Sequence, residues 1–186
     1  MSTVWLSKVL GISRTPVREA LQQLAVDGLV QMNQGRAVTN TARSPQEVYD
    51  ALHVRELLEP ESIRLCATDM SPEAKSRLQD LIDLMMVAAR EEDRSGWSRA
   101  DQEWHEILCN DCPNKLLGQM VLQARHRMYH RGSDENVSAQ YLVQGTEEHR
   151  QIQAAIVAGD GQRAAQLTQD HLQKLKENIF RRYIRS

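Results

Sequence analysis

Helix-start signals recur from residue 44 onward and limit what this chain can fold into. Ser44-Pro45 and Ser71-Pro72 each place a capping serine before a proline at the first helical position. Pro60 predicts a kink or a break in the first of these two helices. Further helices are expected at about residues 94–112, 114–131, 138–159 and 161–184. No convincing strand pattern follows residue 43, so residues 46–186 are predicted to form an antiparallel all-helical bundle.

The composition agrees with a mostly α protein. Hydrophobic residues make up 41% of the 186 residues, whereas aromatic residues make up only 4%, which favours a core filled by Leu, Ala and Met. No apolar run approaches the length needed to cross a membrane. The first residues show no apolar segment followed by a small-residue cleavage site. We therefore expect a cytoplasmic protein that does not enter a membrane.

Four polar residues fall on the predicted apolar faces of three separate helices. They are Asp101, His105, His149 and His171. Asp101 and His105 are four residues apart, so they project from one face of their helix. Buried polar groups are costly without partners, and the four could share one.

A divalent metal ion is the simplest shared partner for Asp101, His105, His149 and His171. The alternative is three unrelated core histidines, each with a local hydrogen bond. Three imidazoles and one carboxylate suit zinc, nickel, manganese and iron alike, and they leave an octahedral ion with open positions for water or an anion.

The three cysteines carry a weaker signal. Cys109 and Cys112 form a CxxC pair without a second pair nearby, so a metal or redox role competes with simple closure of a helix before Pro113, which we prefer. Cys66 lies beside Leu65 and Ala67 and is interpreted as core packing.

Residues 1–43 differ from the rest in charge and pattern. They hold five basic and two acidic residues, a net of +3 against −5 for the remainder. A short helix is expected to end at Gly11, and Thr15 and Pro16 are expected to begin the next one. Two helices joined by a tight turn describe a helix-turn-helix, with Arg14 and Arg18 at the start of its recognition helix.

Two short extended runs follow in LVQMNQGRAVTNT, around Asn33-Gln34-Gly35. This pattern predicts a β-hairpin, which would form a wing beside the helix-turn-helix. Residues 1–43 are therefore predicted to be a winged helix-turn-helix domain that meets a polyanion.

GISRTPVREALQQLAVDGLV resembles the helix-turn-helix signature of the GntR family of bacterial transcription regulators. VRELLEPESIRLCA, ADQEWHEILCNDCPN and EEHRQIQAAIVAGDGQRAAQLTQDHL resemble the all-helical effector domain of its FadR-type branch. In the metal-binding members of that branch an Asp, a His four residues later and two further His form the site, which implies the same role for the four residues above.

The resemblance also implies roles for other residues. Ser13, Arg14, Arg18 and Gly35 match positions that contact DNA in the family. Arg55 and Arg125 match positions near the effector cavity, where they would bind a small organic acid, although a surface salt bridge is an equal alternative for each. Members of this branch generally act as dimers on palindromic operators, so a homodimer is expected.

The chain departs from the family pattern at its N-terminus. Family members usually carry another helix and a short strand before the position of Leu6, and this sequence has neither. We therefore expect an incomplete winged helix that is poorly packed and that needs the missing segment for tight operator binding.

Three classes of function remain open at this point. The predicted one is a DNA-binding regulator whose C-terminal domain binds a divalent metal and a small carboxylate. A stand-alone metal-binding or dimerisation module is an alternative, given the shortened head. A metal-dependent hydrolase is a weaker alternative, because no GxSxG, HExxH or P-loop pattern appears.

Overall fold

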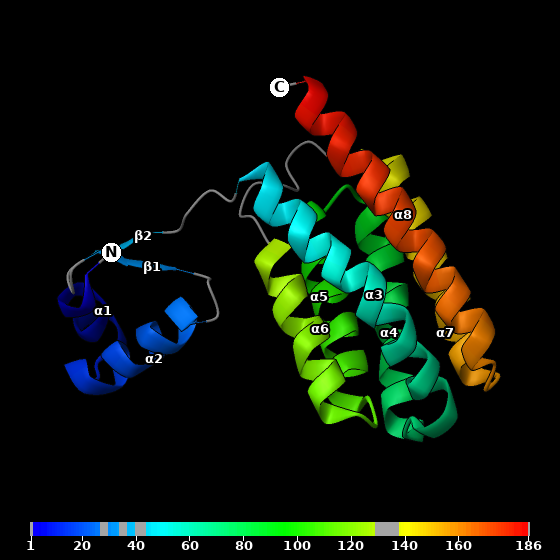
Figure 1. Cartoon of the computed structure of the whole chain (residues 1–186), viewed down its shortest axis with the longest axis horizontal. Coiled ribbons are helices and arrows are strands. Elements are labelled where there is room, and N and C mark those ends of the chain that lie inside the picture. The colour runs from blue at the N-terminus through cyan, green and yellow to red at the C-terminus, as the bar shows by residue number, and fades with distance from the viewer. Residues whose placement is uncertain (1, 27–29, 34–36, 40–43, 129–137, 186) are drawn as a thin grey trace.

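The computed structural model describes residues 2–26, 30–33, 37–39, 44–128 and 138–185. Two groups of elements are visible in Figure 1. A small N-terminal head holds two helices and a two-stranded hairpin, and a larger bundle of long helices follows it along the chain.

The head begins with α1 (Thr3–Leu10), which ends at Gly11. Gly11 is in the left-handed region at φ 67°, a conformation in which a residue without Cβ pays no steric cost. Helix α2 (Arg14–Val26) follows and packs against α1. It begins at Arg14, so the prediction that Thr15 caps this helix is wrong: Thr15 lies inside the first turn.

Strands β1 (Gln31–Asn33) and β2 (Ala37–Thr39) pair antiparallel, with Met32 opposite Val38. The predicted hairpin is therefore confirmed. Its turn, including Gly35, lies outside the described residues, as does Gly28, which was expected to end α2.

The bundle contains α3 (Pro45–Asp69), α4 (Pro72–Arg90), α5 (Arg94–Asp111), α6 (Lys115–Met128), α7 (Ala139–Val157) and α8 (Gly161–Arg185). Helix α3 packs along both α6 and α8, and it also touches α5 and α7. Helix α4 packs against α5 and α7, and α7 packs against α8. Among helices that follow one another along the chain, α5 also packs against α6.

The helix starts follow the expected capping chemistry. The Ser44 and Glu47 side chains form a reciprocal capping box at α3, and Ser71 accepts a hydrogen bond from the backbone N–H of Ala74 at α4. Helix α3 continues through Pro60, so the alternative of a break at that residue is wrong. The packing of α3 against neighbouring helices on several sides holds it together despite the hydrogen bond that the proline removes.

One apolar core runs through the bundle between α3, α4, α5 and α7. Its largest members include Trp104, Leu78, Leu81, Met85 and Ile156, all of which are fully buried. Trp104 lies one residue before His105, so the core reaches directly to the predicted metal site. No helix within the described ranges combines the length and the apolar character that a membrane span requires.

Candidate metal centre

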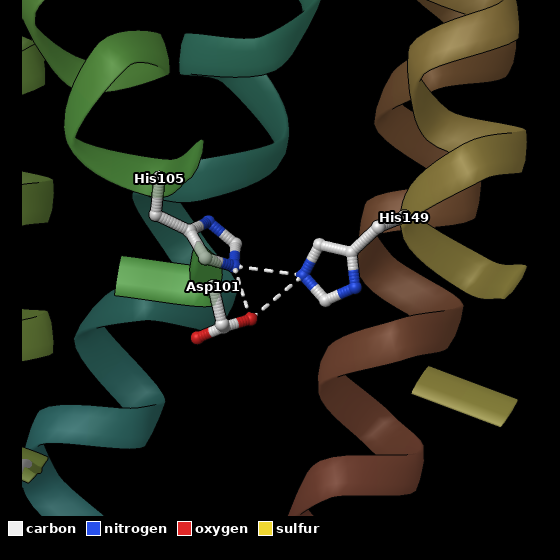
Figure 2. Close-up of side chains that lie close together, drawn as sticks. All are labelled: Asp101, His105 and His149. Carbon is white, nitrogen blue, oxygen red and sulfur yellow. Dashed lines mark hydrogen bonds and ion pairs between the residues drawn. The ribbon is translucent and has the colours of Figure 1, made fainter. Parts of the chain in front are cut away.

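Helices α5 and α7 bring three of the four predicted ligands together. The Oδ1 atom of Asp101 lies 3.1 Å from Nε2 of His149 and 3.6 Å from Nε2 of His105. The two Nε2 atoms are 3.0 Å apart. Figure 2 shows the triangle that these atoms form, with Asp101 and His105 on one helix and His149 facing them from the other.

The size of this triangle fits one metal ion. Atoms bound at about 2.1 Å to a common ion lie about 3.0 Å apart in octahedral geometry and about 3.4 Å apart in tetrahedral geometry. The three separations bracket these values closely. Spacing along the sequence places Asp101 and His105 on one face, and the structure brings the predicted ligand His149 to them from 44 residues away.

The hydrogen bonds behind the triangle decide which ring atoms face inward. The Nδ1 atom of His149 lies 2.6 Å from the carbonyl oxygen of Gly145, one turn earlier, and so donates to it. A neutral ring that is protonated at Nδ1 presents a lone pair at Nε2. The Nδ1 atom of His105 faces Oε1 of Glu59 at 3.4 Å, which favours the same tautomer. With both rings in this tautomer, the three converging atoms are all acceptors, so they are held together by a proton shared between them in the metal-free protein or by a cation.

The fourth predicted ligand, His171, comes from α8. Its ring centroid lies 4.9 Å from that of His149. It is not a member of the group whose ligand atoms all lie within 4.8 Å of one another, which consists of Asp101, His105 and His149. Its Nδ1 atom contacts Oε2 of Glu148 at 2.8 Å, so Nε2 is the atom left to bind.

The site is buried and apolar on one side. Trp104 packs edge-to-face against the rings of both His105 and His149, with centroid distances of 4.7 and 4.6 Å. Burial, aided by the positive charge of Arg125, lowers the pKa of His105 to about 3. Burial also lowers the pKa of His171. Both rings are therefore neutral near pH 7, which is the form that binds metals.

Burial works against ionisation of Asp101, but its contacts with His105 and His149 outweigh it and hold the pKa well below the usual range. Asp101 therefore contributes a negative charge. Its second oxygen, Oδ2, accepts a hydrogen bond from Arg125 at 3.4 Å, which leaves Oδ1 directed at the two histidines.

Both predicted effector arginines lie beside this site, joined by a residue that the sequence analysis missed. Glu59 on α3 is buried and accepts hydrogen bonds from Nε of Arg55 at 2.7 Å and from Arg125 at 3.3 Å. Burial disfavours the charge of Glu59, yet the two arginines lower its pKa far below the usual range. The surface alternative is wrong for both arginines, because their side chains are only 5% and 14% exposed.

A sequence signal for Glu59 was available. Leu52, Arg55, Glu59 and Ile63 follow helical spacing on one face, and all four are buried. An Arg and a Glu four residues apart within an apolar stripe indicate a buried pair. Glu148 and the carbonyl of Gly145 had no comparable signal, because their roles depend on the orientation of the ring that each contacts.

The predicted DNA-contacting residues lie in the head. Ser13, Arg14 and Arg18 are exposed, and the last two belong to the first two turns of α2. Gly35 lies outside the described residues.

The three cysteines are buried, and none forms a disulfide. Cys112 ends α5, as the preferred interpretation expected. Burial raises the pKa of Cys109 to about 12 and that of Cys66 further still, so neither is a reactive thiolate near neutral pH.

Comparison with known families gives two matches along the chain. Residues 2–39 match the family of bacterial regulatory proteins named gntR, and residues 50–174 match the FCD domain. Among curated proteins, an HTH-type transcriptional regulator from the TAR-I ttuE-ttuC' intergenic region of Agrobacterium vitis is 34% identical over 55% of this chain and 62% of its own length. The Exu regulon transcriptional regulator of Escherichia coli K12 is 26% identical over 91% of this chain and 71% of its own length.

A solved structure has the same fold. Escherichia coli McbR/YncC superposes with a TM-score of 0.86 at 22% identity, covering 98% of this chain and 87% of that one. At this identity the likeness concerns the fold alone. The relatives and matched families are regulators rather than enzymes, which argues against the hydrolase alternative.

Proposed function

This chain belongs to the GntR family of bacterial regulators and carries an FCD domain, and from this premise we propose that it senses a small carboxylate through a divalent metal ion. The winged helix-turn-helix, residues 1–43, would bind operator DNA. The helical domain, residues 46–186, would bind the metal and the effector and would hold two copies together as a homodimer.

The convergence of three acceptor atoms carries the metal proposal. The three atoms are Oδ1 of Asp101 and the Nε2 atoms of His105 and His149, which lie 3.0 to 3.6 Å from one another. A metal ion bound by all three would remove the need for a proton between these acceptors. His171 would supply the fourth ligand through its Nε2 atom. Zinc, nickel, manganese and iron all accept this set. Such an ion would hold an anion by direct coordination.

The charges around the site support an anionic effector. Asp101 and Glu59 carry two negative charges, and Arg55 and Arg125 carry two positive ones, so these four side chains balance one another without a metal. A divalent ion adds two positive charges that histidines do not neutralise. Uncompensated buried charge is costly, and a carboxylate beside Arg125 would offset one of these two charges.

The DNA proposal rests on the head. Arg14 and Arg18 at the start of α2 would reach phosphates and base edges in the major groove, with Ser13 before them and Gly35 in the wing. Helix α3 is the first bundle helix after the wing and also carries Arg55 and Glu59. A shift of α3 on effector binding would change the placement of the two heads, and operator affinity with it.

Elemental analysis and native mass spectrometry of the purified protein test the metal. We expect one divalent ion per chain, and His149→Ala should abolish its retention and lower the melting temperature. His126→Ala on α6 is the matched control, since this histidine lies outside the cluster. Full occupancy in the His149 variant would refute the ligand assignment.

Effector titrations with and without operator test the coupling. An effector that weakens operator binding must itself bind less tightly to the DNA complex by the same factor. Equal effector affinity in both states would reduce the bundle to a passive dimerisation module. Thermal shifts of the metal-loaded protein across small carboxylates would identify the ligand class.

A further inference from the structure

The histidines of the metal centre share a hydrogen-bonding rule. In each of the three, Nδ1 faces an acceptor and Nε2 is left for the ion. His149 uses the Gly145 carbonyl at 2.6 Å, whereas His105 faces a carboxylate at 3.4 Å. His171 uses a carboxylate too, at 2.8 Å, and this is the shorter of the two carboxylate contacts.

The acceptor for His171 is Glu148, which precedes His149 on α7. Its other oxygen, Oε1, accepts a hydrogen bond from Nζ of Lys174 at 2.9 Å, so both carboxylate oxygens are held. The Glu148 side chain is only 15% exposed. These two contacts hold the Glu148 carboxylate in place between α7 and α8 as a fixed acceptor.

We propose that Glu148 is a positioning residue of the metal centre, which fixes the tautomer and orientation of His171 so that its Nε2 atom serves as the fourth ligand. This inference rests on the proposed function. Helix α7 would then supply one ligand directly, His149, and would orient a second one, His171 on α8, through Glu148.

His171 needs such a partner more than the other histidines do. His105 and His149 are packed against Trp104, and they lie within the tight triangle with Asp101. His171 stands outside that group, at 4.9 Å between ring centroids from His149. A carboxylate at Nδ1 selects the tautomer with a free Nε2 and raises its basicity, and loss of such a contact typically weakens metal binding about 10- to 100-fold.

Glu148→Gln is the direct test, because it keeps the side-chain size and removes the charge. Glu147→Gln is the matched control: the adjacent residue is exposed and pairs with Arg150 on the surface. Cobalt(II) would be titrated into each metal-free protein and followed by its d–d absorption, with zinc affinity measured by chelator competition. We expect about a 10-fold or greater loss of affinity and an altered cobalt spectrum for Glu148→Gln, and wild-type behaviour for Glu147→Gln.

Thermal unfolding of the metal-free variants separates positioning from folding: Glu148→Gln should melt somewhat lower, because it loses its charged contacts with His171 and Lys174, but it should still unfold cooperatively and well above the temperature of the titration. Wild-type affinity and spectrum in that variant would overturn the inference, and so would an equal loss in the control. If the wild-type protein itself binds no cobalt or zinc, the proposed function fails and this inference with it.

A measurement on the wild-type protein covers the case in which the variant does not fold. Long-range proton–nitrogen correlation spectra of the imidazole rings report which nitrogen carries the proton. We expect a proton on Nδ1 of His171. A proton on Nε2 in the folded protein would overturn the inference.

Discussion

The helical bundle buries charged side chains in its interior, whereas the N-terminal head leaves large apolar side chains exposed. The bundle buries Arg55 and Glu59 along with its core, and within the described residues no buried side-chain nitrogen or oxygen lacks a hydrogen-bond partner. The described core of the head is the pair Val17 and Leu21, with partly buried neighbours, while Trp5 on α1 is 52% exposed.

This difference indicates how each region is held together. The bundle contains a buried network of ion pairs between Glu59, Asp101, Arg55 and Arg125 beside its apolar core. Removal of one member leaves a buried charge without its partner, which lowers the stability of the fold. The head depends on a few apolar contacts, which predicts local opening at a lower free energy than in the bundle.

The largest effect is expected for Glu59→Ala in the bundle. This change leaves Arg55 buried without its carboxylate and leaves Arg125 with Asp101 as its remaining carboxylate, and removal of one partner from such a buried pair costs about 3–5 kcal/mol. Urea denaturation measures the loss. Glu61→Ala is the control on the same helix, since its pair with Arg64 is on the surface and should contribute at most about 1 kcal/mol. Equal losses would show that the network does not stabilise the bundle.

Leu21→Ala should destabilise the head by about 2–3 kcal/mol while leaving the bundle unchanged. Leu21 is 5% exposed, whereas Leu24, three residues along the same helix, is 37% exposed and serves as the control. Hydrogen exchange resolved by peptide should be faster than in the wild-type protein in α1 and α2 and unchanged in α5. Faster exchange throughout the chain would mean that the head and the bundle unfold together.

Acid should weaken the bundle before the head. Burial and Arg125 lower the pKa of His105 to about 3, from about 6.5 in the unfolded chain, and burial lowers that of His171. Between these values the unfolded state binds more protons, so stability falls as the pH drops below about 6.5. The carboxylates facing these rings, Glu59, Asp101 and Glu148, also have lowered pKa values and add losses of the same sign below about pH 4.5.

His105 and His171 can each contribute up to about 1.4 kcal/mol per pH unit in this window. All six histidines of the chain lie beyond residue 50, so the head should show no corresponding change between pH 7 and pH 5. Urea denaturation of metal-free protein across this range, with exchange measured in α2, tests both statements. A bundle stability that is flat from pH 7 to pH 5 would contradict the burial of neutral rings.

The sequence was informative where local chemistry determines structure. Ser44-Pro45 and Ser71-Pro72 start helices as expected, and helical spacing correctly assigned Asp101 and His105 to one face. Prediction from the sequence failed where packing between helices determines the structure. Helix α3 runs through Pro60 because neighbouring helices support it, and Glu59 lies in the core because Arg55 and Arg125 surround it. The contact between Glu148 and His171 joins two helices and depends on their relative rotation, which spacing along either helix does not give.

The smallest expected effect is on DNA affinity, and it tests whether DNA contacts the basic head and not the bundle. The head carries a net +3 in residues 1–43, and Arg18 is exposed on α2. A side chain that neutralises one phosphate contributes about one unit to the slope of log affinity against log salt concentration. Arg18→Gln should therefore weaken binding to a nonspecific duplex modestly and lower this slope by about one.

Arg163→Gln is the control for that measurement, since Arg163 is also an exposed arginine but lies on α8 of the bundle. We expect its slope to match the wild-type value, because phosphate contacts would come from the head alone. Fluorescence anisotropy at four or five salt concentrations is sufficient to determine each slope. If both variants lower the slope equally, DNA lies across the bundle as well, and the division of labour between an exposed, basic head and a buried, ligand-binding body would have to be abandoned.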